Sequence, residues 1–570
     1  MNKCICFWAA LSLLCFSSLL QASEWQWSVA MPGVVSNETG GHPQAFLWIP
    51  SDCKQVKAVM VGTHNMTEET LFDIPAFREK LAEAGIALVW ITPIWDQQWD
   101  VTTGSQAAFN KMMEDLAAVS GYTELKYAPI VPVGHSAMAT FPWNFAAWNP
   151  ERTLAVISYH GDAPRTNLCG YGRENLEWGR TRNIDGIPGL MIEGEYEWWE
   201  ARVNPALAFR MMYPESCISF LCDTGRGHFD IADRTAAYIA LFLKKALATR
   251  LPETTDTDNS ETSATDNSAS SAVDRPIQLK KLNPQDGWLA ERWRGGNPSQ
   301  AETREAAPLK QPKRIKPAPF KQYKGDKHDA FWYFDREMAE LTEDIYRQEQ
   351  GKQPQYVGFV QAGKLLAYNQ DSHVRVAARF LPEADGLTFH LQPVYTNSRR
   401  TAISEEEHAS VEPVITRICG PVQKVNDTTF TVRFYRMGMY NPRRTGDITL
   451  LVASSGDSRY KSAVQELNLR IPYRNTEGKR QCILFPGLPD VEAGTESLSL
   501  NATSDCNLPV YYYVKEGPAE VAGNKLAFTP IPPRGKFPLK VTVVAWQYGL
   551  AGKVQTAEPV ERSFFIYPKR

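Results

Sequence analysis

Residues 130–138 read Ile-Val-Pro-Val-Gly-His-Ser-Ala-Met, and the rest of the sequence can be interpreted outward from this turn. The apolar run at 130–133 predicts a buried strand, and a helix pattern containing Phe141 and Phe145 follows the turn. A serine between such a strand and helix is held in a strained backbone conformation that projects its hydroxyl above the sheet. Ser136 is therefore a candidate nucleophile. The same Gly-x-Ser spacing recurs at residues 456–458, but no helix pattern follows it there.

The sequence on both sides of this turn alternates between strand and helix patterns. A helix pattern at 71–84 lies between two strand patterns and ends at Gly85. Continuous apolar strands separated by helices are typical of a mainly parallel sheet covered on both faces. We therefore predict a doubly wound α/β fold for this part of the chain. The apolar runs that predict its strands are 45–49, 58–61, 87–92, 130–133, 154–159, 190–193 and 217–222.

Two later residues have the chemistry to activate Ser136. A serine needs a base to remove its proton, usually a histidine reached from a later strand. His228 follows the strand pattern at 217–222 and precedes a helix pattern at 231–247. A carboxylate must in turn orient the imidazole, and Glu197 follows the strand pattern at 190–193. Glu195 and Asp162 remain alternatives for this acid.

A tetrahedral oxyanion formed at Ser136 would need two preorganised N–H donors. Ala137 directly follows the candidate nucleophile, so its backbone amide is the first candidate donor. The second is expected in the loop at 62–66, with His64 or Asn65 as the donor.

Residues 24–252 resemble the α/β-hydrolase family in strand count, in element order and in the order Ser136, Glu197, His228. The resemblance implies a Gly-x-x-acid spacing after the strand at 190–193, which favours Glu197. It also implies a serine ester hydrolase that works through an acyl-enzyme with no cofactor and no metal. Met138 departs from the family pattern, which usually has a small residue at that place.

The N-terminal residues indicate export. Residues 1–23 carry an early Lys3 and then an apolar run that is short for a membrane span, which predicts a signal peptide. The mature chain is then expected in the periplasm or outside the cell. A lipid anchor on Cys15 is the alternative, although Leu14 stands where a lipoprotein signal usually has a small residue. No later stretch is long enough to predict a membrane span.

The length of 570 residues predicts more than one domain, since single cores stop growing near roughly 250–300 residues. Residues 253–274 contain no lysine, arginine or aromatic residue, so we predict a linker or exposed loop at 253–275. It separates the α/β unit at 24–252 from a connecting segment at 276–355, in which a helix is expected at 329–350. Short strand patterns follow and predict β-sandwich modules at 356–475 and 476–570.

The two β modules are expected to be copies of one another. Gly420-Pro421 and the strand patterns after it recur about 95 residues later, beginning at Gly517-Pro518. Repeated strand patterns at that period are typical of tandem sandwiches. The last module also resembles bacterial immunoglobulin-like domains, in the runs at 508–512 and 523–526.

Some aromatic and basic residues are candidates for substrate binding. Ligands of open α/β sheets bind at the carboxyl ends of strands, where Trp95 and Trp99 follow one strand and Trp198 and Trp199 another. Their rings could stack on sugars, although tryptophan also dominates ordinary cores. Arg165 lies in a segment where hydrolases often carry a lid and could bind a uronate carboxylate.

An exported hydrolase joined to β modules looks like the polysaccharide esterases of gut and marine bacteria, including the pectin methylesterases of carbohydrate esterase family 19. The resemblance implies removal of methyl esters from uronic acids, with acetyl or feruloyl esters as the alternative. A non-catalytic carbohydrate-binding or adhesion protein on a hydrolase fold is the rival hypothesis. A formal charge of −3 does not favour nucleic acid as a partner, and oligomeric state is left open. No cysteine spacing predicts zinc.

Overall fold

In a computed structural model, the described residues are 25–569 except 97, 166–175, 198, 253–275, 295–312 and 370–375, and the side chains of 199–201. The predicted signal peptide, the alternative anchor at Cys15 and the predicted linker at 253–275 lie outside these residues. Within the part of the chain that is described, no helix combines the length and apolarity needed to cross a membrane.

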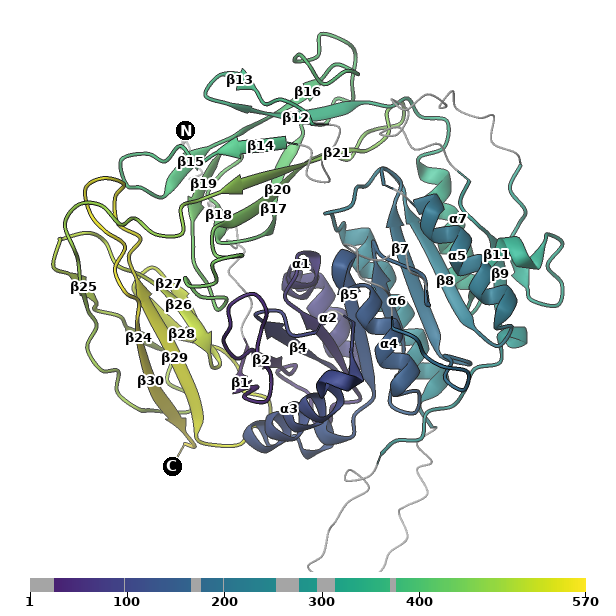
Figure 1. Ribbon diagram of the computed structural model, residues 1–570, viewed down its shortest axis with the longest axis horizontal. Helices are drawn as coiled ribbons and strands as arrows, with labels where there is room; N and C mark the ends of the chain where they lie inside the picture. The colour runs from purple at the N-terminus through teal and green to yellow at the C-terminus, as the bar shows by residue number, and fades with distance from the viewer. Residues whose placement is uncertain are drawn as a thin grey trace, which may run out of the picture.

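The N-terminal part of the chain forms an eight-stranded sheet in the order β1-β2-β4-β3-β5-β6-β7-β8 (Figure 1). β2 pairs antiparallel with β1 and β4, and every pair from β4 to β8 is parallel. This is the doubly wound sheet predicted from the sequence, in the strand order of an α/β-hydrolase. The strands are β1 (Trp27–Ala30), β2 (Gln44–Trp48), β3 (Ala58–Thr63), β4 (Ile86–Thr92), β5 (Ile130–His135), β6 (Val156–Tyr159), β7 (Pro188–Gly194) and β8 (Cys217–Asp223).

Helices cover both faces of this sheet, because its central strands are apolar on both sides. Met60 of β3 packs in one core with Phe77 of α2, whereas its neighbour Val61 packs in a second core with Phe109 of α3. The helix expected at 71–84 is two helices, because Ile74 is extended and Pro75 starts a new helix. The helices are α1 (Thr67–Asp73), α2 (Pro75–Ala84), α3 (Ser105–Ser120), α4 (Thr140–Trp148), α5 (Trp199–Met212) and α6 (Asp233–Arg250).

The connecting segment adds to the α/β unit. The predicted helix at 329–350 is wrong at its start, because residues 330–333 form β11 (Ala330–Tyr333), which pairs with β9 (Trp288–Glu291). α7 (Arg336–Gln348) begins only after Asp335, whose side chain caps it by accepting from the Met338 amide. Phe331 stacks on Phe220 of β8 at 5.0 Å, so the segment extends the core of the sheet. A short strand, β10 (Ala318–Pro319), completes this small sheet.

Residues 356–475, here called the middle module, and residues 476–570, the C-terminal module, share one strand arrangement. The shared sheets are β14-β21-β20-β17 and β15-β19-β18 in the middle module, and β23-β30-β29-β26 and β24-β28-β27 in the C-terminal module. The middle module also has the sheet β13-β12-β16, and the C-terminal module has the pair β22-β25. In each copy the first strand of the larger sheet runs parallel to the second, whereas the other pairs are antiparallel. This matches the predicted repeat and is compatible with β-sandwiches; the immunoglobulin-like assignment stays a prediction.

The strands of each module have the following bounds. Those of the middle module are β12 (Tyr356–Gln361), β13 (Lys364–Leu365), β14 (Val376–Arg379), β15 (Thr388–His390), β16 (Gln392–Thr396), β17 (Val414–Cys419), β18 (Val422–Lys424), β19 (Thr429–Val432), β20 (Asp447–Ser454) and β21 (Ala463–Arg470). Those of the C-terminal module are β22 (Ile483–Leu484), β23 (Val491–Glu492), β24 (Ser497–Ser499), β25 (Thr503–Ser504), β26 (Tyr511–Glu516), β27 (Ala519–Ala522), β28 (Lys525–Phe528), β29 (Leu539–Trp546) and β30 (Val560–Tyr567).

Both modules pack against the α/β unit (Figure 1). The C-terminal module lies beside β1 and α3, where Arg534 pairs with Glu124 at 2.9 Å and Gly517 bridges to Trp25. A single apolar core runs from Trp27 of β1 into Val541 of β29. The middle module instead contacts the loops at the carboxyl ends of β7 and β8.

Candidate active site

Ser136 occupies a tight turn between β5 and α4. Its φ is +52°, a left-handed value that costs energy for a residue other than glycine. The turn requires glycine at position 134, two residues before Ser136, because a Cβ there would lie 1.9 Å from the Met138 carbonyl oxygen. The Met138 side chain is fully buried in a core with Phe141, so this turn accommodates the departure from the family pattern. Ser136 itself remains partly exposed.

The turn brings Ser136 against a histidine and an acid from later loops. His228 follows β8, and its Nε2 lies 2.8 Å from the Ser136 Oγ. Its Nδ1 hydrogen-bonds a carboxylate oxygen of Glu197, which follows β7. Glu197 also accepts from the Gly194 amide at 2.5 Å, which orients its carboxylate. The three residues can therefore relay a proton from the hydroxyl to the imidazole while the carboxylate stabilises the charged ring.

The other two candidate acids are directed to different partners. Glu195 accepts from the Gly225 amide at 2.8 Å and forms an ion pair with Lys461 at 2.8 Å. Asp162 pairs with Arg202 at 3.1 Å, and burial raises the pKa of its carboxyl to about 6. The geometry thus favours Glu197 among the three candidates. Glu195 and Glu197 are both buried, so neither belongs to a solvated acidic surface.

Of the N–H donors predicted for an oxyanion, Ala137 and Asn65 remain candidates, whereas His64 does not. Ala137 follows Ser136 at the start of the turn and is partly exposed. The His64 amide is already used, because it donates to the Ile91 carbonyl at 2.7 Å, so His64 is wrong as a donor. Asn65 is held beside the turn by its side-chain amide, which donates to the His135 carbonyl at 2.7 Å. The backbone amide of Asn65 is therefore the remaining candidate in this loop.

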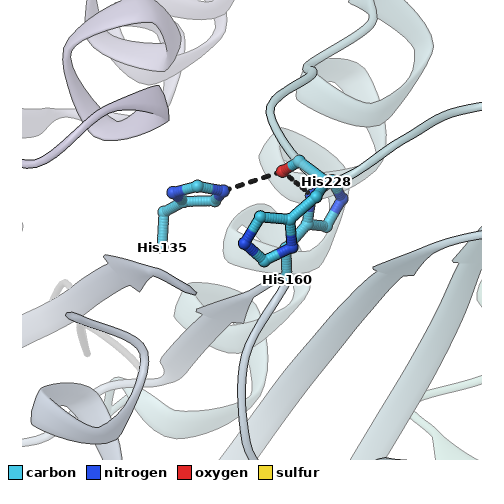
Figure 2. A group of neighbouring side chains, drawn as sticks. All are labelled: His135, His160 and His228. Carbon is cyan, nitrogen blue, oxygen red and sulfur yellow. Dashed lines mark hydrogen bonds between the residues drawn. The ribbon is translucent and has the colours of Figure 1, made fainter. Parts of the chain in front are cut away.

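Two histidines to which the sequence pattern assigned no role, His135 and His160, hold the loop of His228. Figure 2 shows the rings of His135 and His160 pointing at the backbone carbonyl oxygen of His228. His135 Nε2 lies 2.8 Å from this oxygen, and His160 approaches it through Nδ1. Because a carbonyl oxygen only accepts, both facing nitrogens carry the proton. Burial lowers the pKa of both rings, which keeps them neutral.

The same three histidines form a cluster whose spacing would suit a metal ion. A metal needs a lone pair on each ligand nitrogen. His135 and His160 instead use the nitrogens that face His228 as hydrogen-bond donors to its carbonyl, and His228 uses its own two nitrogens toward Ser136 and Glu197. The cluster is thus a scaffold that positions His228.

Glu193 is a further buried acid that the sequence did not single out for this site. It is the last residue but one of β7, interacts with Glu197 and is completely buried. Burial raises its pKa well above the usual range, against the opposing effect of Arg202, and the neighbouring Glu197 raises it further. Burial therefore favours the protonated, neutral form of Glu193. This form avoids a second buried charge next to the Glu197 carboxylate.

The residues predicted to bind substrate divide into several groups. Trp99 is wrong as a contact residue, because it is completely buried and packs on Phe145 at 4.7 Å. Trp95 is half-buried beside it and keeps an exposed part. Trp198 and the side chain of Trp199 lie outside the described residues. The Arg165 guanidinium donates to Gly179 at 2.7 Å and to the Tyr213 hydroxyl, and it lies over Trp178, so internal contacts already hold it.

Comparisons with known proteins were made for the whole chain. No protein-family model matches the chain, and neither does any curated protein. Among solved structures, the chain is similar to esterases.

The similar structures include an esterase of Pyrobaculum calidifontis, with 14% identity and a TM-score of 0.29, over 38% of this chain and 84% of that one. A fluorophosphonate-binding serine hydrolase of Staphylococcus aureus has 13% identity and a TM-score of 0.27, over 39% and 96%. Est1E of Butyrivibrio proteoclasticus has 16% identity and a TM-score of 0.25, over 39% and 97%. The fold is assigned from the strand order of this chain, and the candidate site from the contacts of its own side chains.

Proposed function

We propose that this chain is a serine ester hydrolase in which Ser136 is the nucleophile, His228 the general base and Glu197 the orienting acid. The observation that carries the proposal is the continuous contact from the Ser136 hydroxyl through both ring nitrogens of His228 to the buried Glu197 carboxylate. A series of hydrogen bonds of this kind leads to reaction only if the serine hydroxyl can reach substrate. Ser136 is partly exposed. This exposure supports an enzyme over a purely structural serine.

The proposed reaction has two steps. Ser136 Oγ attacks the ester carbonyl while His228 Nε2 takes its proton, and the oxyanion accepts from the amides of Ala137 and Asn65. His228 then returns the proton to the departing alcohol, which leaves an acyl group on Ser136. Water attacks this acyl-enzyme by the same route in reverse and frees the acid. Glu197 stabilises the imidazolium in both steps.

We propose an ester-decorated polysaccharide as the substrate, with methyl esters of uronic acids as the first candidate. The predicted export signal, the two β modules and the exposed part of Trp95 support a large extracellular glycan. In this case methanol is the leaving group and the uronate stays on Ser136 until water releases it. For the alternative acetyl and feruloyl esters, the sugar hydroxyl leaves instead.

The test uses the purified chain and Ser136→Ala on methylated pectin, acetylated xylan and feruloylated xylan. We expect methanol release from pectin by the native chain. We also expect at least about a 10⁴-fold lower rate for Ser136→Ala on a simple aryl acetate, since the nucleophile is removed. Acetate or ferulate release instead of methanol would move the substrate to the alternative ester. Turnover by Ser136→Ala at the native rate would overturn the mechanism.

A further inference from the structure

The middle module contacts the acid loop of the candidate site through an ion pair between a buried carboxylate, Glu195, and a partly buried lysine, Lys461. The Lys461 Nζ, just before β21, lies 2.8 Å from a carboxylate oxygen of Glu195. Glu195 is fully buried and is separated from Glu197 by a single residue. If one partner of a buried ion pair is removed, the other charge is left uncompensated. The loop must then move so that water can reach this charge. The position of Glu197 thus depends on a residue of another module.

Ser462 joins three parts of the α/β unit. Its carbonyl accepts from the Tyr196 hydroxyl at 2.6 Å, and its own hydroxyl donates to the Gly225 carbonyl at 3.3 Å. Its amide donates to Glu349, beyond the end of α7, at 2.9 Å. Tyr196 stands between Glu195 and Glu197, and Gly225 lies in the loop that carries His228. One residue of the middle module therefore holds both the acid loop and the histidine loop.

The two surfaces fit closely, above all at Gly225, whose φ of +73° also favours glycine. A Cβ on Gly225 would lie 1.7 Å from the Ser462 Oγ, and one on Gly227 would lie 2.2 Å from a Glu466 carboxylate oxygen. Next to these glycines, Phe229 packs in a small apolar cluster with Val464 of β21 and Ile418 of β17. The histidine loop is therefore seated against the module along its length.

The contact also extends to the helix that follows the oxyanion loop. Glu69 of α1 is buried, pairs with Arg417 of β17 and accepts from the Tyr435 hydroxyl at 2.8 Å. Thr70 donates to the Ile418 carbonyl. The middle module thus contacts the elements that follow β3, β7 and β8, which carry the predicted second oxyanion donor, the acid and the base.

We propose that the segment at 460–466 of the middle module, which leads into β21, positions the catalytic loops, with Lys461 as the positioning residue that fixes the acid loop. This inference rests on the proposed function. Because a displacement of about 1 Å from the reacting geometry can cost roughly 10²-fold in rate, docking of the middle module sets the turnover rate of Ser136. Glu349, just beyond the C-terminal end of α7, also takes part in this contact.

The test measures kcat and KM on a small aryl acetate, with the full chain and rates expressed per folded protein. We expect Lys461→Met to lower kcat by at least about tenfold with little change in KM. Arg459→Gln is the matched control, because Arg459 pairs with Glu407 on the exposed side of the same module. The double variant Lys461→Met with Glu195→Gln should recover most of the rate, since the uncompensated charge is gone while an acceptor for the Gly225 amide remains.

A native-like kcat for Lys461→Met, equal to that of Arg459→Gln, would overturn the inference. So would a double variant no faster than Lys461→Met, because a charge-independent defect would then explain the loss. If Lys461→Met does not fold, Lys461→Arg replaces it, and a kcat loss of at least about threefold is expected from the altered contact. Failure of the proposed function looks different, because the native chain would then lack turnover or Ser136→Ala would retain it.

Discussion

Glu197 and Asp162 are both buried acids near the carboxyl ends of neighbouring strands, yet only Glu197 is placed on the His228 ring. We expect Glu197→Gln to lower kcat on an aryl acetate by about 10³–10⁴-fold, because an amide neither fixes the required tautomer nor stabilises the imidazolium. Asp162→Asn is the matched control and should lose far less. Steady-state kinetics of the two variants decide between them. Equal losses would contradict the assignment of the acid.

His64 gives a test of stability at the scale of one residue. It is buried against Trp90, and burial lowers its pKa to about 3, whereas an unfolded histidine titrates near 6.5. The unfolded chain therefore binds an extra proton between these values, so native stability falls as the pH drops below 6.5.

His64→Gln removes this proton uptake. Relative to the native chain, we expect the variant to gain about 1.4 kcal/mol per pH unit below pH 6. Urea unfolding of both proteins at pH 7.5 and pH 4.5 measures the difference. A stability difference that stays constant over this range would show that His64 is not buried as a neutral ring.

At the scale of elements, the turn between β5 and α4 depends on Gly134. We expect Gly134→Ala to abolish turnover of small esters and to lower the melting temperature, because the new Cβ would collide with the Met138 carbonyl at 1.9 Å. Gly33→Ala is the control, since a Cβ there meets nothing within 4 Å. Kinetics and thermal unfolding report both effects. A fully active Gly134→Ala would refute the tight turn.

The elements that the sequence predicted well are those with a strong local pattern. Residues 130–133 and 217–222 are continuous apolar runs, and each lies within a buried strand. The predictions were wrong where the structure of a segment depends on more than its local pattern. Residues 330–333 continue a helix-like pattern, but their aromatic side chains pack as a strand against β8. Ile74 precedes a proline that splits the expected helix.

The candidate site was predictable only in part, for a similar reason. Ser136 and His228 follow strand patterns that place them at one edge of a parallel sheet. His135 and His160 could not be identified, because their role depends on a backbone carbonyl of a distant loop. The contribution of Lys461 depends on how a separate module docks, which no local pattern encodes.

At the scale of the whole molecule, the α/β unit and the C-terminal module share one core. Trp27 of β1 is buried in the same cluster as Val541 and Phe564. We expect Trp27→Ala to cost about 3–5 kcal/mol and to lower a single calorimetric transition that includes both parts. Val35→Ala, at an exposed position, should leave that transition unchanged. A separate transition of the C-terminal module that keeps its native midpoint would contradict the shared core.

The most direct test of the central claim is labelling of the full chain with an active-site-directed fluorophosphonate, followed by peptide mass spectrometry. Such probes react with a serine whose hydroxyl is activated by a base. We expect one adduct on the peptide that contains Ser136, no adduct in Ser136→Ala, and slower labelling of His228→Ala. A native chain that stays unlabelled, or an adduct that persists in Ser136→Ala, would contradict the assignment of Ser136 as an activated nucleophile.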